Sequence, residues 1–237
     1  MGCGCVGPSK DKYSIENILN EKIQEPKEIT SNLPISEYVK KVFCLINKVR
    51  LNPSEFVAAI EQAEKYIKEI NGKKIFDNNN IKVSLNEGKK MFQDCADCLR
   101  NLAPMEELIF CDEIVLDCPK DDKNIRDINH FKEKLLEKKE KFGIEAYFKD
   151  SIRIPEISVL LMLVDDSTRN PKKKRETLLN PNYKFIGISS SDNTIGKEEN
   201  KNNDHLRDNN INGGTNNIDK ILKNKLNKPF CAYFTLK

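Results

Sequence analysis

The sequence predicts a domain that mixes α-helices and β-strands; a helical and a strand pattern support this fold class, and the hydrophobic fraction shows that a core is possible. Two late segments, residues 183–188 and 230–236, are rich in aromatic and β-branched residues, which favours strands. Hydrophobic residues make up 38% of the chain, enough for a core but below the level of ordinary globular domains. From residue 36 onward, apolar residues recur at steps of three and four, as in an amphipathic helix: Val39, Val42, Phe43, Ile46 and Val49.

A second helix is predicted to begin at Asn52-Pro53-Ser54-Glu55, which has the pattern of an N-cap, a proline and an acid in the first turn. Its apolar face extends to Ile67, with Gly72 as the stop, and residues 71–80 are predicted to form a loop. A third helix is expected after a capping box of Ser84 and Glu87.

Later segments complete this prediction. Residues 131–142 are expected to form a charged helix that Gly143 ends. The apolar run 157–164 fits either a buried strand or a buried helix. Residues 189–227 are rich in Asn and poor in large apolar residues, so we expect a disordered insertion. Residues 1–32 are interpreted as an anchor and tether that precede a domain at 33–237.

Composition argues against several classes of protein. The chain has 40 Lys and Arg against 37 Asp and Glu, so its net charge is only +3, and we expect no nucleic-acid partner. No stretch approaches the roughly 18 apolar residues of a membrane-spanning helix. The first ten residues lack the apolar core of a secretory signal.

The eight cysteines are expected to be reduced thiols, because the chain is long and shows no export signal. Cys95 and Cys98 form a close pair, and Cys111 and Cys118 follow. A structural zinc site usually needs two close pairs, and the second spacing is too wide. We therefore expect half-buried thiols rather than zinc ligands.

The N-terminus predicts attachment of fatty acids. Removal of Met1 would expose Gly2, the acceptor of N-myristoylation, although Val6 replaces the Ser or Thr that usually follows. Cys3 and Cys5 lie beside it as candidate sites of S-palmitoylation. One myristoyl chain binds bilayers with a constant of only about 10⁴ M⁻¹, so two chains are needed for stable anchoring. The alternative is that both cysteines are incidental in a flexible tail.

Four stretches resemble the CAP superfamily (cysteine-rich secretory proteins, antigen 5 and pathogenesis-related 1), particularly its divergent protist members. They are FCLINKVRLNPSEFV, LRNLAPMEELIF, the segment from ISVLLMLVDD to LLNPNYKFIGIS, and PFCAYFTLK. The resemblance covers roughly residues 36–190 and 228–237. It implies a three-layer α-β-α sandwich, in which helices flank a small, largely antiparallel sheet. It also implies that residues 157–164 are helical.

In this family two His and two acidic residues converge in a cleft that binds a divalent metal in some members. Carried over by motif, the first His falls near His130 and the first acid falls at Asp150. The second acid falls at Asp165 or Asp166, and Lys174 takes the place of the second His.

The replacement of His by Lys174 predicts a cleft without metal, and we expect no other cofactor. An ammonium has no lone pair for zinc and repels the cation. Removing its proton at neutral pH would cost about 4–5 kcal/mol. We expect Lys174 to pair with Asp150 instead. His130 is then interpreted as a surface residue of a charged helix.

These observations favour a non-enzymatic domain of CAP type on the cytosolic face of a membrane. Its expected partners are membrane lipid, a protein or a second copy of itself. The basic residues Lys172, Lys173, Lys174 and Arg175 fit either contact with lipid headgroups or a solvated turn. The alternative function is a metal-dependent hydrolase that uses His130 and the acids of the cleft. A third interpretation is a scaffold that binds through the Asn-rich insertion.

Overall fold

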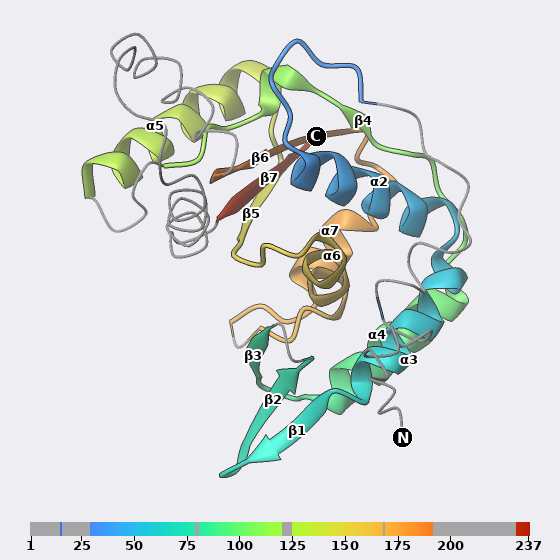
Figure 1. Ribbon diagram of the computed structural model, residues 1–237. Helices are drawn as coiled ribbons and strands as arrows, with labels where there is room; N and C mark the ends of the chain where they lie inside the picture. Colours follow the sequence, from blue (N-terminus) through green and yellow to red (C-terminus); the bar gives the residue numbers. More distant parts are fainter. Residues whose placement is uncertain (1–14, 16–28, 79–80, 120–124, 168, 192–230) are drawn as a thin grey trace, which may run out of the picture. The chain divides into compact units, whose positions relative to one another are not determined.

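The structure is a computed structural model that describes residue 15 and residues 29–78, 81–119, 125–167, 169–191 and 231–237 (Figure 1). As predicted, the described chain mixes helices and strands. It forms two compact units. Unit 1 comprises Met1–Glu28, Lys41–Leu108 and Ile154–Asn182, and unit 2 comprises Ile29–Lys40, Ile109–Arg153 and Tyr183–Lys237.

Helices form most of the described part of unit 1. The predicted first helix is confirmed as α2 (Glu37–Leu51), which enters the unit at Lys41. A 3-10 turn, η1 (Pro53–Phe56), leads into α3 (Val57–Glu64). The other helices are α4 (Lys89–Asn101), α6 (Pro155–Val164) and α7 (Lys173–Leu178). The run 157–164 is therefore helical, as the family resemblance implied.

Two polar side chains of α2 organise the backbone around them. The Asn47 side-chain amide donates to the Leu108 carbonyl at 3.0 Å and accepts from the Leu108 N–H at 2.8 Å. Arg50 is fully buried, and burial lowers its pKa to about 10. Its guanidinium donates to three carbonyls, which compensates for the loss of water: Glu106 at 2.8 Å, Leu178 at 2.7 Å and Asn180 at 3.1 Å.

A three-stranded antiparallel sheet also belongs to unit 1. It contains β1 (Ile67–Ile70), β2 (Lys73–Asp77) and β3 (Lys82–Leu85) in that order. Asn71 and Gly72 join the first two strands, with φ of 52° and 71°. An Asn-Gly turn with positive φ at both positions matches the twist of a hairpin. On the inner side of the sheet, the Phe76 ring stacks on Phe92 of α4, with centroids 6.1 Å apart.

This sheet corrects two predictions. The second helix ends at Glu64 rather than Gly72, and Ile67 lies in β1. Half of the predicted loop 71–80, residues Lys73–Asp77, is strand β2. The Asn-Gly dipeptide explains both errors, because it closes a hairpin whose strands had been divided between a helix and a loop.

Unit 2 contains a four-stranded sheet in the order β4-β6-β7-β5. The strands are β4 (Ile109–Phe110), β5 (Ala146–Asp150), β6 (Phe185–Ser190) and β7 (Ala232–Leu236). All pairs are antiparallel except β4 with β6. Both strands predicted from aromatic and β-branched residues are thus confirmed. The Asn-rich insertion lies almost wholly outside the described residues.

One long helix, α5 (Ile125–Phe142), packs on this sheet in unit 2. Its Phe131 ring contacts the Tyr233 ring of β7 at a centroid distance of 4.3 Å. The helix ends before Gly143, whose φ of 70° is the left-handed conformation expected of a glycine stop. A 3-10 turn, η2 (Asp112–Ile114), follows β4 in the same unit.

Candidate functional site

The predicted cleft residues lie in both units. Asp165, Asp166 and Lys174 belong to unit 1, whereas His130 and Asp150 belong to unit 2. The expected ion pair between Asp150 and Lys174 would join different units, and it stays a prediction. Gly2, Cys3 and Cys5 lie outside the described residues.

His130 lies on the surface of α5. Its side chain is 71% exposed, and its Nδ1 is 3.9 Å from Oε2 of Glu133, one turn later on the same helix. Such a pair is an ion pair only when the imidazole is protonated. This placement agrees with the interpretation of His130 as a surface residue of a charged helix.

Asp150 is the last residue of β5 and is buried. Its Oδ2 accepts the backbone N–H of Ile152 at 3.1 Å. A carboxylate that bonds to the backbone two residues later stabilises a local turn. Asp150 therefore shapes the exit from the strand.

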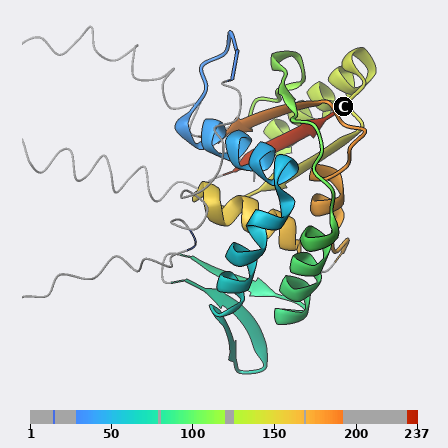
Figure 2. The same cartoon turned by 90° about the vertical axis from the view of Figure 1, so that its right-hand side faces the viewer.

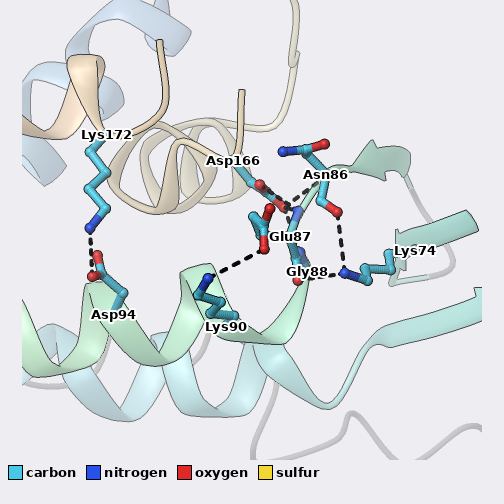
Figure 3. A network of polar contacts seen from close by, with 8 residues as sticks. All are labelled: Lys74, Asn86, Glu87, Gly88, Lys90, Asp94, Asp166 and Lys172. Atoms are coloured by element: carbon cyan, nitrogen blue, oxygen red, sulfur yellow. Dashed lines mark hydrogen bonds and ion pairs between the residues drawn. The ribbon is translucent and has the colours of Figure 1, made fainter. Parts of the chain in front are cut away.

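Asp166 binds the backbone that precedes α4 (Figure 3). Its carboxylate accepts the N–H groups of Asn86 at 3.0 Å, Glu87 at 2.9 Å and Gly88 at 2.8 Å. Three successive N–H groups that converge on one anion form a backbone nest. Lys74 closes the same loop from the other side, because its Nζ donates to the Asn86 and Glu87 carbonyls.

This arrangement corrects the predicted capping box. Ser84 lies in β3, and α4 begins only at Lys89. A residue distant in sequence, Asp166, orders the segment that the local pair Ser84 and Glu87 was expected to cap. Gly88 is required there, since its φ is 65° and an added Cβ would lie 2.8 Å from the Lys74 side chain.

Asp165 joins the end of α6 to the start of α7. It ends α6 in the left-handed conformation, with φ of 43°, and is buried. Its Oδ2 accepts the Lys174 N–H at 2.7 Å, and its backbone carbonyl accepts the Lys172 N–H at 3.1 Å. Burial raises the pKa of Asp165, and the Lys174 N–H and neighbouring cations only partly oppose that effect.

Asp94 of α4 forms an ion cluster with two members of the basic run. Lys172 Nζ lies 2.7 Å from Asp94 Oδ1, and Arg175 Nη2 pairs with Oδ2. Burial acts to raise the pKa of Asp94, but the hydrogen bonds and charges of Lys172 and Arg175 outweigh it, so this pKa lies below its usual value. We call these three residues the Asp94 cluster.

The Asp94 cluster changes the interpretation of residues 172–175. Arg175 is only 4% exposed, so the prediction that it contacts lipid headgroups or lies in a solvated turn is wrong. Its Nη1 is buried without a hydrogen-bond partner, and beside it burial raises the pKa of the Cys95 thiol to about 11. Lys173 remains exposed. Lys172 and Arg175, rather than the whole basic run, thus contribute ion pairs within unit 1.

Sequence reasoning missed Asp94. Asp94 is only partly exposed and lies beside the buried face of α4, one turn after Met91, and a charge at that border was the available signal. Such a residue needs a cation or a hydrogen-bond donor nearby, because an unpaired buried charge is costly.

Unit 2 has a pocket of about 490 Å³ between the first residues of the unit and the strands β4 and β6. Phe110 and Phe185 give its lining apolar surface, and Cys111 and Glu113 line it as well. The Cys111 thiol donates to Glu113 Oε2 at 3.1 Å, and its pKa is raised, by burial first and by this carboxylate second. A neutral thiol is a weak nucleophile, so the pair does not resemble an activated cysteine.

Metal-binding clusters and disulfides are both absent from the described residues. No group of three or more His, Cys, Asp or Glu residues there could hold a metal ion. The six described cysteines are free thiols; Cys95, Cys118 and Cys231 are buried, whereas Cys98 is exposed. None of the described helices is long and apolar enough to cross a bilayer.

Comparison of the chain with protein-family models, with curated proteins and with solved structures gave no match.

Proposed function

We propose that this protein is a non-enzymatic domain of CAP type that N-terminal acyl groups hold on the cytosolic face of a membrane. Gly2 would carry a myristoyl group, and Cys3 and Cys5 would carry palmitoyl groups. Two chains anchor a protein where one permits exchange, because each buried CH₂ contributes about 0.8 kcal/mol. The domain would act by contacting lipid or a membrane-associated protein.

The arrangement of Gly2, Cys3 and Cys5 within five residues is the observation that carries the anchoring. Gly2 is the acceptor that myristoylation requires. Cys3 and Cys5 are close enough to it for palmitoylation at the membrane that the myristoyl group contacts. Lys10 and Lys12 would add attraction to anionic lipid, each about 1 kcal/mol at most.

The non-enzymatic role is supported by the contacts of the acidic residues carried over from the family. Asp166 binds three N–H groups, and Asp165 binds the Lys174 N–H. A carboxylate committed to the backbone is poorly placed to act as a general base or to bind metal. The CAP-type sandwich is supported by the helical α6 and by the mostly antiparallel sheet of unit 2.

Cell fractionation of the full chain tests the anchor. We expect the wild type in the membrane fraction and Gly2→Ala in the soluble fraction, since loss of myristoylation also removes the first membrane contact that palmitoylation needs. Cys3→Ser/Cys5→Ser should bind weakly and reversibly. Ser9→Ala, in the same segment, is the matched control and should stay on membranes. Membrane retention of Gly2→Ala would refute the anchor.

A further inference from the structure

The hairpin sheet of unit 1 has one face that points away from α4. Side chains alternate along each strand, and Phe76 marks the inner face through its stacking on Phe92. The cross-strand pairs Ile70 with Lys73, Lys68 with Ile75 and Asp77 with Lys82 define the other side. We call this side the outer face: Lys68, Ile70, Lys73, Ile75, Asp77, Lys82 and Ser84.

The outer face is basic, and its lysines, Ile70 and Ser84 are open to solvent, whereas Asp77 is buried. Lys68, Lys73 and Lys82 are exposed and Asp77 is the one acid, so three positive charges less one negative leave +2. Asp77 Oδ2 lies between two of the lysines, 3.3 Å from Lys68 Nζ and 3.5 Å from Lys82 Nζ. Both lysines keep most of their surface in solvent, with side chains 52% and 72% exposed.

Ile70 gives this face an apolar tip. It is 44% exposed, and among the described residues of unit 1 no other large hydrophobic residue is as exposed. It directly precedes the tight Asn71-Gly72 turn, which lies at the end of the hairpin away from α4 (Figures 1 and 2). The two-residue turn fixes the backbone, so Ile70 is presented on a rigid element between Lys68 and Lys73.

We propose that the outer face docks on an anionic lipid surface, with Ile70 entering the headgroup region and the lysines contacting phosphate and carboxylate groups. This inference rests on the proposed function, because acyl chains would already hold the domain at the bilayer. A tethered contact forms at high effective concentration, so a weak second contact is sufficient to orient the domain. An apolar tip flanked by cations is the pattern of interfacial membrane binding.

Charge and size favour lipid over a protein partner. Anionic membranes attract basic groups close to their surface, which matches the charge of the outer face. A stable protein interface usually involves about 20–30 residues on each side. The outer face contributes seven, which is too few for a protein partner but enough for a wedge into a bilayer.

Tryptophan fluorescence tests this proposal directly, because the chain contains no Trp. Ile70→Trp, made in the full chain without acyl groups, should show a blue-shifted emission with phosphatidylserine vesicles and quenching by brominated lipid. Pure phosphatidylcholine vesicles should have little effect. Leu136→Trp, at another exposed position but in α5, is the matched control and should stay unchanged. No shift at Ile70→Trp, or equal shifts at both positions, would overturn the proposal.

The lysines are tested in the Ile70→Trp background. Lys68→Ala/Lys73→Ala should weaken vesicle binding about 25-fold, since each lysine near an anionic surface contributes about fivefold. Lys89→Ala/Lys90→Ala, which removes two exposed lysines of α4, should leave binding unchanged. Equal losses in both double variants would mean that only net charge matters, which refutes docking by this face. The assay contains no acyl groups, so its failure leaves the fractionation test of Gly2 unaffected.

Discussion

Two lysine-bearing regions of unit 1 use the same residue type in opposite ways. In the Asp94 cluster, Lys172 and Arg175 converge on one carboxylate, and the arginine is buried. On the outer face of the hairpin, the lysines flank Asp77 at longer distances and keep most of their surface exposed. The first region stabilises the fold, whereas the second leaves its charge available to a partner.

The comparison teaches that the density of charge along a sequence does not locate a binding surface. The sequence has four consecutive basic residues at 172–175, yet Arg175 is buried and pairs with Asp94. The lysines of the hairpin are spread over 15 positions and come together only when the strands pair.

The largest expected effect is the loss of the acid at the centre of the Asp94 cluster. Asp94→Ala leaves the buried Arg175 without its counter-charge, and removing one partner of a buried pair typically costs about 3–5 kcal/mol. Partial exposure of Asp94 places the expected loss of unfolding free energy near the lower end, about 3 kcal/mol. Urea unfolding measures it.

Asp97→Ala is the matched control for Asp94→Ala. Asp97 is on the same helix, but its ion pair with Arg100 is exposed, so we expect a change below about 0.5 kcal/mol. Similar losses in the two variants would mean that the Asp94 cluster is an ordinary surface network, and the contrast with the outer face would disappear.

A smaller effect is expected at the backbone nest. Asp166→Ala removes the acceptor of three N–H groups, which water can partly replace, so we expect a loss of about 1–2 kcal/mol. Hydrogen exchange at Asn86, Glu87 and Gly88 should accelerate in the variant. Unchanged exchange at these amides would show that Asp166 does not order the start of α4.

The smallest effect is a dependence of stability on pH. The pKa of Asp94 in the folded protein lies below its ordinary value of 3.8, so its contribution is complete above that value and is lost as the pH falls through the folded pKa. The raised pKa of Asp165 acts in the opposite sense, because protonation relieves the cost of burying its charge.

Urea unfolding midpoints of the wild type and of Asp94→Asn, each measured at about pH 5 and pH 3, isolate the contribution of Asp94 to stability. The wild type should lose more stability than Asp94→Asn on acidification, since the variant has no carboxylate to protonate at this position. An equal or larger loss in Asp94→Asn would assign the acid sensitivity to other groups.

Local patterns predicted those elements whose stabilising contacts are close in sequence. The apolar periodicity predicted α2, the aromatic and β-branched runs predicted β6 and β7, and Gly143 predicted the end of α5. In each case a neighbouring residue supplies the signal, either through a repeat of side chains or through a backbone that only glycine adopts readily.

The missed features depend on contacts between distant residues. Asp166 accepts hydrogen bonds from a segment about 80 residues earlier in the sequence. Arg175 donates a hydrogen bond to Asp94 across a similar separation. No local pattern encodes such pairs. The hairpin is different, because the local dipeptide Asn71-Gly72 is typical of a hairpin turn. It was not used because the helical pattern of the preceding residues extended to Ile67 and assigned the first strand to a helix.

Mass spectrometry of the N-terminal peptide from protein isolated from its native cells is the most direct test of the central claim. We predict a myristoyl amide on Gly2 and hydroxylamine-sensitive palmitoyl thioesters on Cys3 and Cys5. A free Gly2 amine with both thiols unmodified would contradict the acyl anchor on which the proposed function depends.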